Sequence, residues 1–212
     1  MLTIHSEIES LVENYPDLKP IQDDIQRGCD LLIGCYHAGG KVLVCGNGGS
    51  AADCEHLVGE LMKGYLAARP LPVSQRAALA DAAIGDGAYL ADRLQGALSA
   101  ISLVSQVGLI TAVANDIGPD MIFAQQVYGY GRAGDVLIAI STSGNSRNVL
   151  LAAQVARALK LGTLGITGRR GALREVCDVT IGVPRDLTAV IQERHLAIYH
   201  AVCGALERTL FG

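Results

Sequence analysis

Residues 134–146 read GDVLIAISTSGNS, and this stretch decides the fold. Its first part, Asp135–Ile140, is a short β-rich apolar run that predicts a buried strand. The hydroxyl-rich loop Ser141–Ser146 follows at once, and the apolar spacing of three and four over Asn145–Leu161 predicts a helix. A strand that passes through a Ser- and Gly-rich joint into a helix is the repeating unit of a parallel α/β sheet.

The same pattern recurs on both sides of this stretch. Further strands are predicted at Lys41–Cys45, Gly162–Ile166 and Asp178–Val183. Further helices are predicted at Ile21–Tyr36, Ser50–Tyr65, Ile122–Gly131 and Thr188–Leu210. Strands that alternate with helices indicate a three-layer α/β/α domain, with a mostly parallel sheet covered on both faces. Residues 1–38 are predicted to form an N-terminal helical extension.

Residues 67–96 fit this alternation least well. They carry Pro70, Pro72 and the turn-prone Ile84–Gly87 between two short segments that could be helices. About 30 residues are too few for an independent core, so we interpret this stretch as an insertion in one domain that spans residues 1–212.

Composition excludes several classes of protein. Of the 212 residues, 50% are apolar and 18% charged, which excludes a disordered chain. A net charge of −4 and the absence of Trp argue against non-specific binding of nucleic acid through its phosphates. The longest uncharged stretches, such as Ala97–Asn115, are broken by polar residues, so no membrane span is expected.

Targeting and redox signals point to the cytoplasm. Glu7, Glu9 and Glu13 occupy the place where a secretion signal would need a positive and then an apolar segment. The six cysteines form no CxxC pair, and several lie inside apolar patterns. We therefore expect reduced thiols and a cytoplasmic protein.

A glycine-rich loop, Gly46–Ser50, joins the first predicted strand to a helix. Glycines let backbone N–H groups approach an anion at the positive end of a helix. The loop is neither a dinucleotide GxGxxG motif nor a P-loop, because the third glycine and the GK[ST] are missing. A tight turn with a Ser cap remains the alternative.

The loop Ser141–Ser146 holds four hydroxyl side chains, those of Ser141, Thr142, Ser143 and Ser146. One hydroxyl is enough to cap a helix, whereas the terminal oxygens of a phosphate monoester require several donors. No Lys or Arg lies within the loop, which favours a small phosphate over a polyphosphate with Mg²⁺. We predict phosphate binding here, with a plain turn as the alternative.

Two polar pairs lie on predicted helices. His56 and Glu60 are four residues apart and share a face, while Gln192 and His200 are eight apart, about 80° around an ideal helix. Together they could bind a divalent ion such as zinc, although their spacing matches neither a zinc finger nor HExxH. An exposed His–Glu pair is the alternative for the first two.

Other polar residues receive more ordinary interpretations. His195, Glu193 and Glu55 are secondary candidates, each expected to be a solvated or capping side chain. Asn115–Asp116, ahead of Gly118–Pro119, is typical of a turn that ends a helix.

Five segments together resemble a known family. They are VLVCGNGGSAADCEHLVGEL (42–61), AND (114–116), GDVLIAISTSGNSRNVL (134–150), GITGRRGAL (165–173) and IQERHLAIYH (191–200). They are similar to the phosphoheptose isomerases of the sugar isomerase (SIS) superfamily, and the match covers most of the chain in the same order. The resemblance implies a SIS-type fold and interconversion of sedoheptulose 7-phosphate with D-glycero-D-manno-heptose 7-phosphate. It also implies a homotetramer with its sites at subunit interfaces.

The resemblance assigns roles residue by residue. It implies zinc ligands at His56, Glu60, Gln192 and His200, with one zinc ion per subunit. It implies substrate contacts at Asn47, Gly48, Gly49, Glu60, Asn115, Asp116 and Gln192, and phosphate contacts at Ser141, Thr142, Ser143 and Ser146. For a proton transfer between C1 and C2 through an enediol, we assign Glu60 as base and His200 as acid.

One departure leaves the substrate open. Residues 67–96, with Arg69, Arg76 and Arg93, replace the shorter connection familiar in the family, and they could reshape the sugar end of the pocket or the tetramer interface. The alternatives are an isomerase of another sugar phosphate and a non-catalytic SIS protein, like the replication-initiation regulator that binds the initiator protein. The presence of both Glu60 and His200 favours an enzyme, because a binding module needs neither.

Overall fold

The computed structural model describes residues 4–82 and 85–212. Within them lies one parallel sheet of five strands in the order β2-β1-β3-β4-β5. The strands are β1 (Val42–Gly46), β2 (Ala100–Ser102), β3 (Val136–Ser141), β4 (Gly162–Thr167) and β5 (Val179–Gly182). The predicted α/β class and parallel sheet are confirmed. Strand β2 was not predicted, because it is only three residues long.

Side chains of the strands alternate between two apolar cores. Val42 and Val44 of β1 face one core, whereas Leu43 and Cys45 face the other. Strand β3 divides in the same way, with Val136 in the first core and Leu137 in the second. This alternation follows from the two-residue period of a strand, and it explains why strands covered on both faces are continuously apolar.

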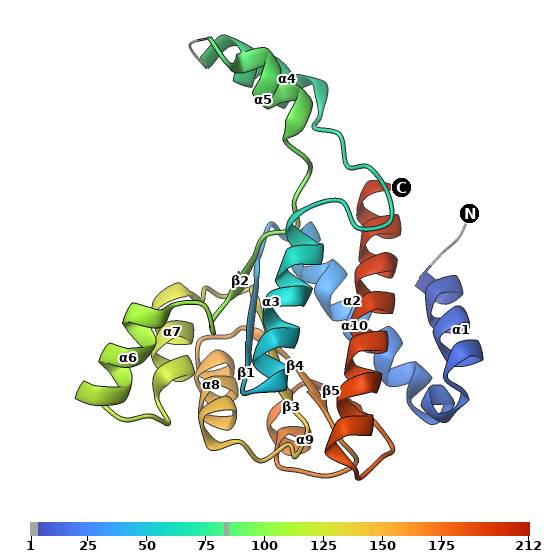
Figure 1. Ribbon diagram of the computed structural model, residues 1–212, viewed down its shortest axis with the longest axis vertical. Helices are drawn as coiled ribbons and strands as arrows, with labels where there is room; N and C mark the ends of the chain where they lie inside the picture. Colours follow the sequence, from blue (N-terminus) through green and yellow to red (C-terminus); the bar gives the residue numbers. More distant parts are fainter. Residues whose placement is uncertain (1–3, 83–84) are drawn as a thin grey trace.

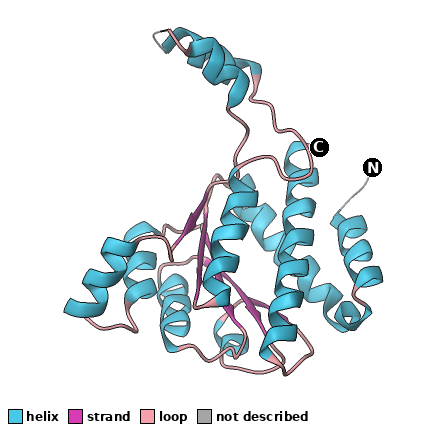
Figure 2. Cartoon of the chain, in the orientation of Figure 1, coloured by secondary structure: helices cyan, strands magenta, loops and turns pink. Residues whose placement is uncertain are grey.

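Helices cover both faces of the sheet (Figures 1 and 2). One layer consists of α2 (Gln22–His37), α3 (Gly49–Met62) and α10 (Thr188–Phe211), with α1 (Ile4–Asn14) and the 3₁₀ turn Pro16–Ile21 packed on its outer side. The other layer consists of α7 (Ile122–Tyr130), α8 (Arg147–Ala158) and α9 (Leu173–Val176), with α6 (Val107–Asp116) beside α7. The three-layer arrangement and the N-terminal helices are thus confirmed.

The chain leaves β1 and β3 toward opposite layers. Helix α3 follows β1 on one face of the sheet, and α8 follows β3 on the other. Because β1 and β3 are neighbours, their carboxyl ends form a switch point, which is where open α/β sheets bind ligands. The glycine loop (Gly46–Ser50) and the loop Ser141–Ser146, here called the serine loop, therefore meet at one edge of the sheet.

Residues 67–96 project from this body as a helical hairpin (Figure 1). It consists of α4 (Val73–Ala82) and α5 (Gly87–Arg93), which pack against each other. The chain enters and leaves at adjacent points, because Pro70 and Gln95 form an antiparallel bridge. Part of the predicted turn at Ile84–Gly87 lies outside the described residues.

No helix in the described ranges has the length and apolar character needed to cross a membrane. The six cysteines are free and buried.

Candidate functional site

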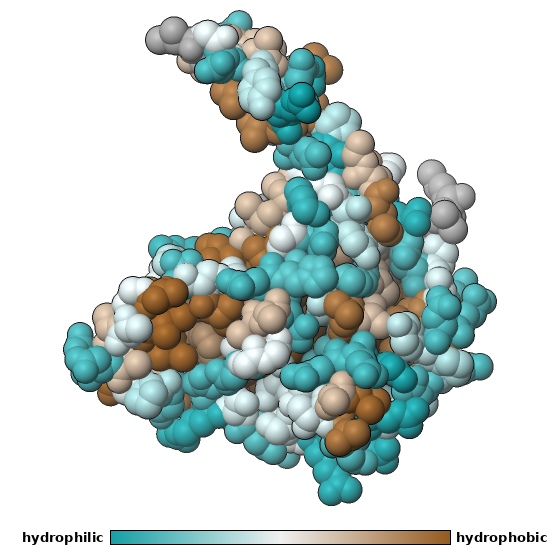
Figure 3. Space-filling view, in the orientation of Figure 1, coloured by the Kyte–Doolittle hydropathy of each residue, from teal (hydrophilic) through white to brown (hydrophobic). Residues whose placement is uncertain are grey.

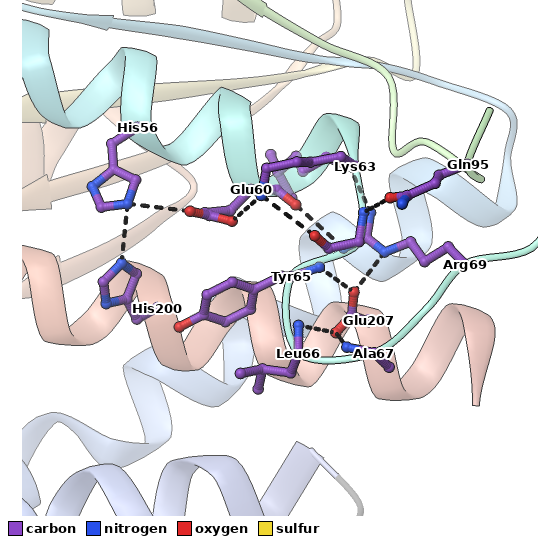
Figure 4. A network of polar contacts seen from close by, with 12 residues as sticks. His56, Glu60, Lys63, Tyr65, Leu66, Ala67, Arg69, Gln95, His200 and Glu207 are labelled. Atoms are coloured by element: carbon purple, nitrogen blue, oxygen red, sulfur yellow. Dashed lines mark hydrogen bonds and ion pairs between the residues drawn. The ribbon is translucent and has the colours of Figure 1, made fainter. Parts of the chain in front are cut away.

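Helices α3 and α10 bring three of the expected ligands together (Figure 4). His56 Nε2 lies 3.3 Å from Glu60 Oε1 and 3.4 Å from His200 Nε2. His56 and Glu60 share a face because they are one helical turn apart, and Leu57 and Leu61 turn the opposite face of α3 into the core. The exposed pair that was the alternative therefore has a third partner from the last helix.

The surroundings hold Glu60 and His200 in different charge states. A hydrogen bond from Lys63, whose Nζ lies 2.9 Å from Glu60 Oε2, lowers the pKa of Glu60 against the opposing effect of burial. Burial, together with the charge of His56, lowers the pKa of His200. At neutral pH the carboxylate is therefore ionised and can accept a proton, while the imidazole is neutral and can bind a metal or donate its single N–H.

Tyr199 and Asp53 orient the ring of His56, a contact that the sequence analysis missed. The buried Tyr199 hydroxyl donates to Asp53 Oδ1 at 3.4 Å and lies 3.0 Å from His56 Nδ1. A hydroxyl has one proton, so while it is given to Asp53 the oxygen accepts from His56 Nδ1–H. This tautomer leaves a lone pair on His56 Nε2, on the side of Glu60 and His200.

These groups fit a zinc ion by donor type, and two of the distances between them also fit. With Zn–N bonds of about 2.0–2.1 Å, two ligand atoms of a tetrahedral site lie about 3.3 Å apart. The two distances from His56 Nε2 have this length. In the part of the chain that the structure describes, no three His, Cys, Asp or Glu side chains are arranged so that they could hold a metal ion. Within one chain, the two contacts of His56 are therefore the distances that match the spacing of a zinc site.

Gln192 lies at the other end of this helix pair. A Cβ on Gly49 would collide with the amide of Gln192, so only glycine at this position allows the side chain to approach the start of α3. Eight residues of α10 separate Gln192 from His200, a rise of about 12 Å along the axis. The spacing predicted that these two side chains project from nearby sides of α10. Their separation along the helix axis is nevertheless large. Metal binding by Gln192 stays a prediction.

The serine loop has the geometry of an anion site. Ser141 Oγ lies 3.0 Å from Ser146 Oγ and 3.4 Å from Ser143 Oγ, so three hydroxyls converge. Ser146 precedes α8 but makes no side-chain cap. Gly144 has φ +65°, and a Cβ there would meet the carbonyl of Arg170. The hydroxyls face one another and leave the first turn of α8 uncapped, which favours a ligand site over a plain turn.

The glycine loop is joined to the serine loop by a pair of amides. Asn47 and Asn148 donate to each other at 2.9 and 3.0 Å, which ties the end of β1 to the first turn of α8. Gly48 has φ +57°, a conformation that suits glycine. Asn47, Gly48 and Gly49 therefore lie beside the expected phosphate position.

Asn115 and Asp116 are exposed at the end of α6, where Asn115 donates to Asp116 at 2.7 Å. This agrees with the predicted turn at the end of a helix. The loop that follows reaches the serine loop, because Asp120 pairs with Arg147 at 3.0 Å, next to Ser146. The pair thus lies in a segment connected to the phosphate edge.

The expected site residues form two groups in one chain. The edge group comprises the glycine loop, the serine loop and Gln192, and the helix-pair group comprises His56, Glu60 and His200. Eleven residues of α3 separate Gly49 from Glu60, a rise of about 16 Å. The carboxylate thus lies well above the edge that would hold a phosphate.

One hollow lies beside the helix pair, and a second lies on the hairpin. One of about 220 Å³ adjoins His200, between α1, α10 and the loop at Tyr65 and Leu66. A larger one, of about 430 Å³, is formed by the hairpin itself, among Leu71, Leu79 and Leu94. Only the first touches a candidate residue, so the larger hollow is remote from the expected chemistry.

The secondary candidates have structural roles. The prediction of a solvated or capping His195 is wrong: its side chain is fully buried, with Nε2 3.2 Å from the carbonyl of Thr167. Burial lowers the pKa of His195 to about 4, so the ring is neutral. Glu193 is exposed beside Arg194, and Glu55 accepts a hydrogen bond from Ser105 at 2.7 Å.

Comparison with known proteins gives one consistent result. A family model described as SIS domain matches residues 11–106 and 88–168. A phosphoheptose isomerase of Akkermansia muciniphila is 37% identical over 210 residues, 99% of this chain and 97% of the relative. One of Rhodospirillum rubrum is 41% identical over 187 residues, covering 88% and 86%.

Solved structures agree with the sequence relatives. The phosphoheptose isomerase structure from Neisseria gonorrhoeae has a TM-score of 0.74 at 32% identity, and covers 94% of each chain. That from Francisella tularensis has a TM-score of 0.75 at 31% identity, and covers 97% of this chain and 96% of its own.

Proposed function

We propose that this chain, which belongs to the phosphoheptose isomerase family of SIS-domain proteins and is a sugar-phosphate isomerase, interconverts sedoheptulose 7-phosphate and D-glycero-D-manno-heptose 7-phosphate. The observation that carries the proposal is the ionised Glu60 beside His56 and the neutral His200. Such a set provides a proton acceptor and a proton donor within one helix-to-helix contact. We take the identity of the substrate and product from the family to which the chain belongs.

The reaction moves one proton between adjacent carbons. Glu60 takes the proton from C1 or C2, and the electron pair left on carbon forms the double bond of a cis-enediol. His200 gives its proton to the carbonyl oxygen, which becomes a hydroxyl. Glu60 then returns the proton to the former carbonyl carbon. The hydroxyl on the carbon that first lost its proton gives its own proton to the imidazole and becomes the new carbonyl, which completes the exchange.

We also propose that His56, Glu60 and His200 hold a zinc ion, one per subunit. When bound, zinc supplies a Lewis acid that polarises the carbonyl oxygen. In the tautomer in which His56 Nδ1–H donates to Tyr199, the lone pair of His56 Nε2 would face this ion. Because Gln192 faces Gly49 in its own chain, we assign the remaining ligand position to Gln192 of a neighbouring copy.

The separation of the two groups supports a site shared between copies. An extended seven-carbon sugar phosphate spans about 10 Å at bond lengths near 1.5 Å, less than the rise of about 16 Å between Gly49 and Glu60. The edge group of one copy therefore meets the helix-pair group of another. Phosphate binding by Ser141, Thr142, Ser143 and Ser146 then positions the carbonyl end, so the loop influences turnover as well as affinity.

An apolar face on α6 fits this assembly, which we propose to be a homotetramer. Val107 is 69% exposed and Ile117 59% exposed, and Figure 3 shows hydrophobic surface over this part of the molecule. Contiguous exposed apolar surface marks association sites, and Ile117 directly follows Asn115 and Asp116, which are expected substrate contacts. The buried free thiols fit our assignment to the cytoplasm.

An isomerase assay tests the substrate. We expect the protein to convert sedoheptulose 7-phosphate to the aldose, detected by NMR of the product, and to act more slowly on fructose 6-phosphate and ribulose 5-phosphate. If either shorter ketose phosphate were turned over faster, that sugar phosphate would replace sedoheptulose 7-phosphate as the proposed substrate. Inactivity on every sugar phosphate, with folded protein and added zinc, would favour the non-catalytic alternative.

A further inference from the structure

A buried ion pair lies where the projecting hairpin joins the domain. Arg69 is 1% exposed and Glu207 is 2% exposed, and Arg69 Nε donates to Glu207 Oε1 at 2.7 Å. Glu207 also accepts the backbone N–H groups of Tyr65, Leu66 and Ala67 at 2.7–2.8 Å. We call these two residues the clamp. It joins the last helix to the loop that leaves α3.

The clamp contacts the end of the helix that carries Glu60. Helix α3 ends at Met62, so the carbonyls of its last turn lack partners within the helix. Arg69 supplies donors to two of them, Nη1 to Leu61 at 2.7 Å and Nη2 to Glu60 at 3.3 Å. The guanidinium of Arg69 therefore caps the end of α3, and one of the carbonyls that it binds belongs to Glu60, which we assign as the base.

The other half of the clamp extends to His200. Glu207 fixes the amide of Tyr65, and the ring of Tyr65 stacks on the imidazole of His200 with 5.7 Å between centroids and 29° between planes. Figure 4 shows Glu207, Tyr65 and His200 side by side along α10. One ion pair thus touches the backbone of the proposed base and, through one ring, the proposed acid.

Stability alone does not explain this arrangement. A buried ion pair roughly balances its cost of desolvation and is often replaceable by apolar residues. What distinguishes an Arg–carboxylate pair is the geometry of its hydrogen bonds, because the two planar groups hold several partners at fixed angles. Here the partners of the clamp belong to the two segments that carry Glu60 and Tyr65.

We propose that Arg69 and Glu207 are positioning residues, which hold Glu60 and the Tyr65–His200 stack in the geometry needed for proton transfer. This inference rests on the proposed isomerase function. Loss of the clamp lowers turnover and leaves substrate affinity nearly unchanged, because no clamp atom reaches the serine loop. A displacement near 1 Å at the reacting groups is enough to cost about 100-fold in rate.

The test uses Arg69→Met and Glu207→Gln. We expect kcat to fall about 10- to 100-fold while KM stays within about twofold. Arg76→Met is the matched control, because Arg76 also binds a carboxylate, that of Asp92, and a backbone carbonyl, that of Ala91, but lies on the hairpin away from the site. Its kcat should equal that of the unmodified chain. A normal kcat in folded Arg69→Met and Glu207→Gln would overturn the proposal.

A second measurement separates positioning from loss of folding. Tyr65→Leu keeps the backbone N–H for Glu207 but removes the stacked ring, so we expect the same loss of kcat with an intact clamp. NMR of the histidine rings, assigned with His200→Asn, should show that the His200 signal loses the ring-current shift of Tyr65 in all three variants. An unmoved His200 signal contradicts the proposal even if activity falls.

The spectrum also distinguishes the two possible failures. If the unmodified protein does not isomerise sugar phosphates, the proposed function fails. The position of the His200 signal in the clamp variants then still decides whether the clamp holds this ring.

Discussion

Glu60 and His200 lie within one helix-to-helix contact, yet their surroundings act on them in different ways. Lys63 stabilises the charged carboxylate, whereas burial and His56 stabilise the neutral imidazole. The residue types in the sequence made both positions candidates. The charge states depend on Lys63, His56 and the packing of α10, which sequence spacing could not supply.

Removal of either group should abolish most of the turnover. We expect Glu60→Gln and His200→Asn each to lower kcat by about 100-fold or more, the scale of one lost acid or base. Both variants should keep the circular dichroism spectrum and oligomer size of the unmodified protein. Near-normal kcat in either would remove that residue from the mechanism.

His195 gives the protein a pH-dependent stability. The unfolded chain binds a proton near pH 6.5, but the buried ring does so only near pH 4, so stability is full above pH 6.5 and falls as pH decreases through this window. At about 1.4 kcal/mol per pKa unit, the loss approaches about 3 kcal/mol. Urea unfolding from pH 7 to 4 measures it.

His195→Gln is the control for this effect, since an amide can still donate to the carbonyl of Thr167. The difference between the two proteins should shrink as pH falls. Parallel stability curves would mean that His195 does not titrate as described.

At the scale of elements, the local apolar spacing of the sequence predicted the positions of the longer strands and helices. The strand expected at Asp135–Ile140 is observed at Val136–Ser141, and the last helix begins at Thr188 as expected. Strand β2 was not predictable from the sequence, because three residues at a sheet edge show no periodicity. The clamp was also missed, since Arg69 and Glu207 are 138 residues apart and only the packing of α10 brings them together.

The hairpin should be removable. Neither apolar core includes a residue of α4, and Pro70 lies opposite Gln95. We expect that replacing residues 71–94 by Asn-Gly, a two-residue turn, changes the free energy of unfolding by no more than about 1 kcal/mol. Urea denaturation measures this change. A loss of several kcal/mol would show that the hairpin stabilises the domain or its assembly.

At the scale of the whole molecule, the fold explains why the expected residues separate. A parallel sheet places the loops after β1 and β3 at one edge, while α3 and α10 carry Glu60 and His200 away from that edge. Spacing along α10 predicted a shared direction for Gln192 and His200 but not the distance between them. On our proposal, the two halves of the site come together when copies of the chain associate.

Mixing two inactive variants tests this claim most directly. Glu60→Gln lacks the base, and Ser143→Asp places a negative charge where the phosphate would bind. Co-refolded in equal amounts, they form sites in which one chain supplies an intact helix pair and the other an intact serine loop. We predict activity up to about one quarter of the unmodified level, as random pairing in a symmetric assembly allows. No recovery from a verified mixed oligomer would show that each site belongs to a single chain, and would contradict a site shared between copies.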